Sequence, residues 1–239
     1  MSCILNIETS TSVCSVALSM DGEVLFAKAS FDGPSHAALL GVFVEEALSV
    51  LKKKGKKALD AVAVSSGPGS YTGLRIGVSV AKGLCFGFGI PLIGIHTLDI
   101  MAATVNSKGD SQIVSMTDNC LYCAMLDARR MEVYAAIYDA SLKPVRETKA
   151  DIVEVGTYAS YLEKGKVCFF GNGASKCKSV ITSPNAIFIE DIHPLAVNMI
   201  PLSEQAFAAG KFEDTAYFEP FYLKEFQATV AKNKLLLAR

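Results

Sequence analysis

The stretch Gly67-Pro68-Gly69-Ser70-Tyr71-Thr72-Gly73-Leu74-Arg75-Ile76-Gly77 decides how the rest of the sequence is interpreted. It follows an apolar segment, 61–65, that we predict as a strand, and it opens a helix predicted over 72–88. Its glycines and proline indicate a tight turn at which the backbone approaches another group closely. Because free N–H groups lie at a helix N-terminus, such a turn can suit an anion.

Two familiar phosphate-binding motifs are excluded by the spacing of these residues. No Gly-Lys-Ser/Thr closes the turn, so it is not a Walker loop, and the third glycine comes one position late for G-x-G-x-x-G.

The residues before the turn carry further information about the fold. We predict a strand over 4–8, the polar turn Glu8-Thr9-Ser10-Thr11, a strand over 13–18, a hairpin turn at Asp21-Gly22 and a third strand over 23–29.

This order of strands and turns resembles the first lobe of the actin/sugar-kinase/Hsp70-like (ribonuclease-H-like) fold. Within that fold, LNIETSTSVCSVALSMDGEVL (5–25) and GPGSYTGLRIGVSVAKGL (67–84) resemble the TsaB (YeaZ) family. DARRMEVY (127–134), GNGA (171–174) and EPFYLK (219–224) extend the resemblance over nearly the whole chain. It implies an α/β fold of two lobes, each a mixed sheet flanked by helices.

The pattern of predicted elements divides the chain into two lobes. A polar junction at 106–110 separates the first α/β unit from a second series of strands, predicted over 112–116, 121–127, 132–138, 166–170 and 186–190. Helices are predicted over 155–164, shortly after Ala174 and over 194–209, the last packing back on the first lobe. The first lobe is then 1–105 plus 194–239, and the second is 106–193. The segment after Phe226 is left open, although 228–237 has a composition that favours a helix.

The resemblance also implies a function. TsaB proteins take part in making threonylcarbamoyladenosine (t6A) at adenosine 37 of tRNA, as non-catalytic partners of the TsaD catalytic subunit. It implies a homodimer when alone, a heterodimer with TsaD, a TsaE-type ATPase as a further partner, and tRNA contact only through the complex. No cofactor is expected for the isolated chain, with ATP or ADP only within the complex.

The helices predicted over 35–54 and 72–88 carry more apolar surface than one sheet face needs, which indicates burial in a core or in an interface. The residues alone leave both open. The resemblance favours an interface with TsaD or a second copy, and the residues expected there are Leu39, Leu40, Phe43, Ala47, Leu74, Val78, Ala81, Leu84 and Cys85.

An ATP-dependent phosphotransferase of the same fold is the alternative function. It would use a degenerate nucleotide turn whose candidate residues are Glu8, Thr9, Ser10, Thr11, Gly67, Pro68, Gly69, Thr72, Gly73 and Arg75. Its second-lobe counterparts would be Asp127 and the short loop 171–174. No catalytic residue is assigned, because a fold alone does not supply a site.

A metal site is not expected. The TsaD subunit holds a metal through an H-x-x-x-H pair, but here His96 is followed four residues later by Ile100, and His36 and His193 have no neighbouring ligand. Cys120 and Cys123 form a C-x-x-C within a predicted strand without a second pair, which leaves a redox role open.

Composition limits the remaining classes of function. The 239 residues carry a net charge of −1, and the one dense basic cluster, 52–57, falls where a helix ends, so a dedicated RNA-binding module is not favoured. Seven cysteines without a predicted leader indicate free thiols and the cytoplasm. The apolar stretch 78–95 contains Lys82, glycines and proline, so no membrane span is expected.

Overall fold

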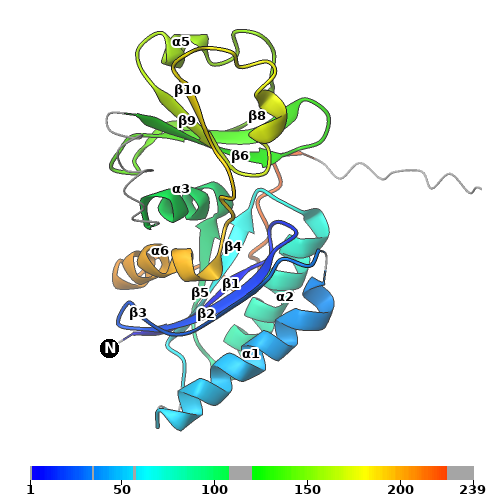
Figure 1. Ribbon diagram of the computed structural model, residues 1–239. Coiled ribbons are helices and arrows are strands. Elements are labelled where there is room, and N and C mark those ends of the chain that lie inside the picture. The colour runs from blue at the N-terminus through cyan, green and yellow to red at the C-terminus, as the bar shows by residue number, and fades with distance from the viewer. Residues whose placement is uncertain (1, 34, 56–57, 108–119, 225–239) are drawn as a thin grey trace, which may run out of the picture.

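The computed structural model describes residues 2–33, 35–55, 58–107 and 120–224. Within them the chain forms two five-stranded mixed sheets (Figure 1). The first sheet has the strand order β3-β2-β1-β4-β5, and its members are β1 (Cys3–Glu8), β2 (Cys14–Met20), β3 (Glu23–Ser30), β4 (Ala61–Gly67) and β5 (Leu92–His96). β1 to β3 form an antiparallel meander, whereas β4 and β5 run parallel to β1.

Helices cover both faces of the first sheet, which explains why its central strands are apolar on both sides. α1 (His36–Lys53) and α2 (Tyr71–Phe88) pack on one face, through a core that includes Leu5, Ile7 and Val64. α6 (Ala196–Ala208) packs on the other face against Ile4 and Ala63. Figure 1 shows α1 and α2 side by side beneath the sheet and α6 on its opposite side.

The second sheet repeats the order of the first. Its order, β8-β7-β6-β9-β10, contains β6 (Leu121–Asp127), β7 (Glu132–Tyr138), β8 (Pro144–Ile152), β9 (Val167–Phe170) and β10 (Ala186–Ile189). Again three antiparallel strands are followed by two parallel ones. Short helices, α5 (Ala159–Leu162) and the 3₁₀ helix η1 (Ser175–Cys177), lie outside this sheet. Two sheets of the same topology define the two-lobed actin-like fold, as expected.

α3 (Thr97–Ser107) joins the lobes. Leu98 and Met101 pack in one apolar cluster with Leu126 and Phe170 of the second sheet, so α3 is buried between the two sheets. The segment after α6 also bridges them: the Glu213 N–H donates to the Leu92 carbonyl, and Lys224 pairs with Glu132. Because α6 packs on β1 and β2, we propose 1–105 plus 194–239 as the first lobe and 106–193 as the second.

Two details differ from the sequence prediction, and two predicted segments lie outside the described residues. The helix predicted over 155–164 forms only at Ala159–Leu162, because 155–157 make a turn around Gly156, whose φ is 89°. β8 was not predicted. The predicted strand over 112–116 and the segment after Phe226 fall outside the described residues.

No helix in the described part of the chain is long and apolar enough to cross a membrane.

Candidate functional site

The polar turn after β1 lies inside the first lobe. Glu8, Thr9 and Ser10 are at most 1% exposed and Thr11 is 8% exposed. The Ser10 N–H donates to Glu8 Oε1 at 2.5 Å. Loss of hydration on burial raises the pKa of Glu8 from 4.5 to about 7, and hydrogen bonds from Ser10 oppose the shift only in part. The fold therefore keeps the Glu8 carboxyl group protonated to a higher pH than an exposed glutamate.

Replacing this carboxyl group with an amide should make the protein more stable at alkaline pH. Because the folded-state pKa of Glu8 is raised, the wild-type protein loses stability as pH rises from 4.5 through 7. A shift of this size lowers the free energy of unfolding of the wild-type protein by about 3 kcal/mol at pH 8 and by less than about 1 kcal/mol at pH 5. Glu8→Gln should gain these amounts. Urea denaturation of Glu8→Gln and wild type at both pH values measures the difference, and an equal gain at both would contradict the raised pKa.

The glycine turn and the first turn of α2 are docked directly on this polar turn. Thr9 Oγ1 donates to the Gly73 carbonyl at 2.8 Å, and the Ser70 N–H donates to the Ser10 carbonyl at 2.6 Å. Ser70 caps the helix, since its Oγ accepts the Gly73 N–H at 3.2 Å. The two segments of the predicted nucleotide turn thus bond to each other.

Close packing explains why glycine occupies these positions. A Cβ at Gly69 would lie 2.4 Å from the Ser10 carbonyl oxygen, and one at Gly73 would lie 2.2 Å from that of Thr9. Gly77, one turn further, would place a Cβ 2.3 Å from Thr9 Oγ1. Gly67 has a φ of 108°, and a Cβ there would lie 2.7 Å from the Phe221 carbonyl oxygen. The glycines serve contact between segments of this chain.

The expectation of free N–H groups for an anion is therefore wrong for Ser70 and Gly73, because the chain itself fills that space. Gly67 and Pro68, joined by a cis peptide bond, are buried. Thr72 and Arg75, the two remaining predicted residues of this turn, are exposed on the outer side of α2. The structure brings the predicted set, apart from Thr72 and Arg75, together as a packed junction.

The second-lobe counterparts are also occupied by their neighbours. Asp127 pairs with Lys176, whose Nζ is 2.5 Å from Asp127 Oδ1, and the Asp127 N–H donates to Asn172 Oδ1 at 2.9 Å. A Cβ at Gly171 or Gly173 would come within 2.3 or 2.8 Å of the backbone of β6. The short loop 171–174 closes this end of the second lobe by packing, as the first glycine turn does.

The histidines do not assemble a metal centre in the part of the chain that the structure covers. There, no group of three or more His, Cys, Asp or Glu side chains could hold a metal ion. His36 is buried with Nε2 2.7 Å from the Thr11 carbonyl oxygen. His96 is exposed and lies edge-on to Phe221, with ring centres 5.5 Å apart. His193 contacts Phe31 in the same way.

The cysteines have the character of core residues. All seven are buried, and none of them is part of a disulfide. Cys120 and Cys123 are at most 3% exposed, and burial raises the pKa of the Cys123 thiol well above its usual range. A buried protonated thiol is a poor nucleophile and a poor metal ligand, so the redox role that the C-x-x-C left open gains no support.

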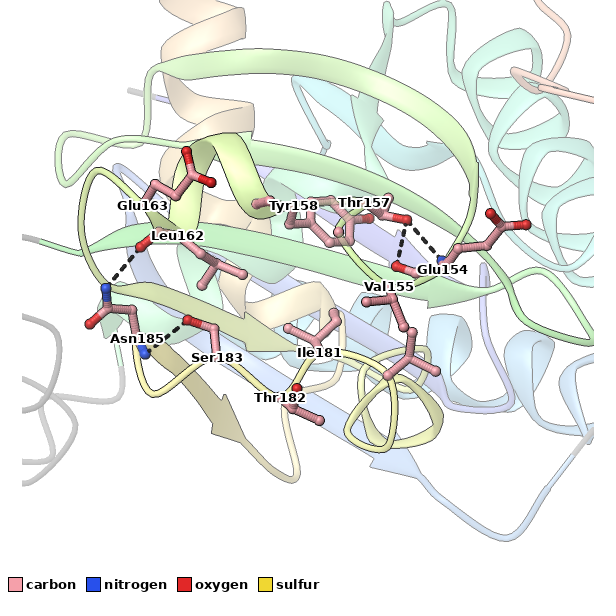
Figure 2. Close-up of a pocket in the computed structure, with 13 residues that line it drawn as sticks. Glu154, Val155, Thr157, Tyr158, Leu162, Glu163, Ile181, Thr182, Ser183 and Asn185 are labelled. Carbon is pink, nitrogen blue, oxygen red and sulfur yellow. Dashed lines mark hydrogen bonds between the residues drawn. The ribbon is translucent and has the colours of Figure 1, made fainter.

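One open hollow of about 430 Å³ lies in the second lobe (Figure 2). It lies between the loop around Val155 and the segment around Ile181. Some of its polar groups bond to one another: Asn185 Nδ2 donates to the Leu162 carbonyl at 2.8 Å, and the Glu154 N–H donates to Thr157 Oγ1 at 2.8 Å. None of the candidate site residues predicted from the sequence lines this hollow.

Burial corrects the residues chosen for the partner interface. Seven of the nine are at most 4% exposed because they face the first sheet, namely Leu40, Phe43, Ala47, Leu74, Val78, Ala81 and Cys85. Leu39 and Leu84 are partly buried. A partner could not touch the seven on the folded chain. The structure thus gives them the core role, which the residues alone had left open.

A different set of residues faces outward on the same two helices. Val42 on α1 is 47% exposed and Phe86 on α2 is 89% exposed. Ser79 and Gly83 are also exposed, and a Cβ at Gly83 would meet nothing within 4 Å. Partly buried Ile76, Val80 and Leu84 lie beside them. We call these seven residues the outer helix face. Its apolar and small residues would allow close approach of another surface.

Fold and site together define the class: a two-lobed protein of the actin/sugar-kinase/Hsp70-like fold, in which the polar turn after β1 is packed against the glycine turn and α2. The family model described as "TsaD: tRNA N6-adenosine threonylcarbamoyltransferase" matches residues 32–232. The chain is 31% identical to tRNA threonylcarbamoyladenosine biosynthesis protein TsaB of Escherichia coli K12, with 97% of each chain covered. It belongs to the TsaB (YeaZ) family.

Two solved structures of YeaZ-like proteins are also similar to this chain. A Pseudomonas aeruginosa protein described as similar to peptidase YeaZ superposes with a TM-score of 0.79 at 26% identity, covering 94% of this chain and 100% of that one. YeaZ from Pseudomonas aeruginosa gives 0.73 at 26% identity, covering 93% and 100%.

Proposed function

We propose that this chain is a non-catalytic subunit of the machinery that makes t6A at adenosine 37 of tRNA, and that it acts by binding a TsaD-type catalytic subunit. Family membership supports the pathway, since the relative from Escherichia coli is named for t6A biosynthesis. The observation that carries the non-catalytic role is the packed junction: Gly73 and Thr9 bond to each other where a nucleotide turn would need room.

The outer helix face is the surface we assign to the catalytic subunit. Phe86 and Val42 expose large apolar side chains there, and exposed aromatic residues are common anchors of protein interfaces. A homodimer of the isolated chain would use the same face, so adding the catalytic subunit should dissolve it. A TsaE-type ATPase would join the pair, and tRNA would be reached within the complex. Seven buried cysteines, none of them in a disulfide, fit a cytoplasmic protein.

A drop-out reconstitution tests this role. TsaC-, TsaD- and TsaE-type proteins are supplied with tRNA, threonine, bicarbonate and ATP, with and without this chain, and t6A is counted by mass spectrometry. We expect t6A only when the chain is present, and no turnover of ATP by the chain alone. Equal t6A without the chain would refute the proposed role, and ATP turnover by the isolated chain would favour the phosphotransferase alternative.

A further inference from the structure

Cationic and tyrosine side chains alternate along the junction of the two lobes. In the first lobe the guanidinium carbon of Arg75 lies 4.6 Å from the ring centre of Tyr71. The Tyr71 ring is 5.1 Å from that of Tyr222, at a tilt of 37°. Arg75 is exposed, and Tyr71 and Tyr222 are partly so. The guanidinium covers one face of the Tyr71 ring, and the exposed parts of this cluster combine positive charge with planar groups on which a base can stack.

The same alternation continues into the second lobe. Lys224 comes two residues after Tyr222 and pairs with Glu132 of β7. This ion pair joins the two lobes. In Figure 1 the red end of the described chain lies beside the end of β6. Burial raises the pKa of Tyr134, and Lys224, Glu132 and Arg129 are the charged groups that also act on it. Tyr134 comes two residues after Glu132 on β7 and therefore lies on the same face of that strand as the partner of Lys224.

The hairpin tip keeps two arginines in a backbone conformation that favours glycine. Arg129 has a φ of 70° and Arg130 a φ of 46°, both in the left-handed region that costs energy for an L-residue with a side chain. Both are exposed, and no hydrogen bond or ion pair joins either guanidinium to another residue in the described ranges. Residues held in such strained backbone conformations cluster at functional sites.

We infer that this row, consisting of Arg75, Tyr71, Tyr222, Lys224, Tyr134, Arg129 and Arg130, is a contact surface for unpaired nucleotides of RNA. Bases would stack on the tyrosines, and phosphates would be held by the guanidinium groups, whose planar fork matches phosphate oxygens. The acidic groups near the row are Glu132, Asp127 and Glu219, of which the first two are paired with lysines. The inference rests on the proposed function, because it names the RNA contact of the same complex.

The hairpin tip allows a test in which loss of folding does not confuse the result. Arg129→Gly/Arg130→Gly removes both guanidinium groups and also relieves both left-handed φ angles, so its melting temperature should not fall below that of the parent. Arg129→Lys/Arg130→Lys keeps the charge. Lys52→Ala/Lys53→Ala removes two exposed charges at the end of α1, far along the chain from the row, and is the matched control.

Binding would be measured with a fluorescein-labelled 17-nucleotide RNA hairpin with a seven-nucleotide loop, by anisotropy at several salt concentrations, for the full chain alone and with the TsaD-type subunit. We expect the glycine variant to bind about tenfold or more weakly at low salt, with a salt slope shallower by about 1.4 because two phosphate contacts are lost. The lysine variant should lose less, and the α1 control should stay within about twofold.

Three outcomes would overturn the inference: no RNA binding by the parent in either form, equal binding by the glycine variant, or an equal loss in the α1 control. Association with the TsaD-type subunit, scored in parallel, separates this from the proposed function. If the glycine variant bound RNA normally but bound that subunit more weakly, the arginines would contact a protein instead. If pairing fails for the parent while RNA binding stands, the proposed function fails and the RNA surface does not.

Discussion

Gly83→Arg should abolish pairing with the TsaD-type subunit while leaving the chain folded. Gly83 is exposed in the middle of the outer helix face, and a Cβ there meets nothing within 4 Å. The helix therefore accepts a side chain, and a residue other than glycine should raise helix stability slightly. In a complex, the arginine would occupy space meant for the partner and would bury an unpaired charge. We expect the dissociation constant to rise 100-fold or more, about 3 kcal/mol.

Calorimetric titration with the TsaD-type subunit measures this loss, and thermal melting checks the fold. Gly165→Arg is the matched control, because Gly165 lies in the second lobe and a Cβ there also meets nothing within 4 Å. The reconstituted t6A yield should fall with Gly83→Arg and not with Gly165→Arg. Normal pairing by a folded Gly83→Arg protein would place the interface elsewhere.

A charge at Val78 would not test the interface. Val78 is 4% exposed and packs in the core between α2 and the first sheet, so Val78→Asp would bury an unpaired carboxylate within the monomer. Loss of pairing in that variant would report unfolding.

The second large effect is expected for Gly73→Ala, which should destabilise the chain by about 3 kcal/mol. A Cβ at Gly73 would lie 2.2 Å from the Thr9 carbonyl oxygen, and the contact is with backbone, which has little freedom to move. The hydrogen bond from Thr9 Oγ1 to the Gly73 carbonyl would be lost or strained. The free energy of unfolding in urea measures the cost.

Gly83→Ala provides the comparison on the same helix. Gly83 has open space where Gly73 has the polar turn, so alanine there should add up to about 1 kcal/mol of stability through helix propensity alone. We therefore expect Gly73→Ala to lower the free energy of unfolding and Gly83→Ala to raise it. If Gly73→Ala were neutral, the polar turn and α2 would not be docked as tightly as the structure has them.

These glycines connect the fold to its function. In the first lobe, Gly69, Gly73 and Gly77 let α2 lie against Thr9 and Ser10, which fixes α2 beside α1 and so builds the outer helix face. The glycine turn, which resembles turns that bind phosphate, here positions α2. We expect the yield of t6A to depend on the outer helix face that α2 helps to form.

Local patterns determined much of the fold. Alternation and turn residues located β1, β2 and β3, and helical periodicity located α1 and α2 within a residue or two. β8 was missed because it is an edge strand whose sequence, PVRETKADI, is largely polar, so no apolar period marks it. The helix predicted over 155–164 was too long because periodicity alone does not reveal where a turn interrupts it.

By itself, the sequence determined the two-lobed fold and the TsaB family, because motifs in order along the chain carry that information without coordinates. Only the tertiary structure decided which apolar residues of α1 and α2 are core, because both helices are apolar around most of their circumference and only packing against the sheet distinguishes Val78 from Phe86. It also decided that the glycine turn is filled, and it brought Tyr71 beside Tyr222 and Lys224 beside Glu132, since contacts between residues far apart in sequence leave no local pattern.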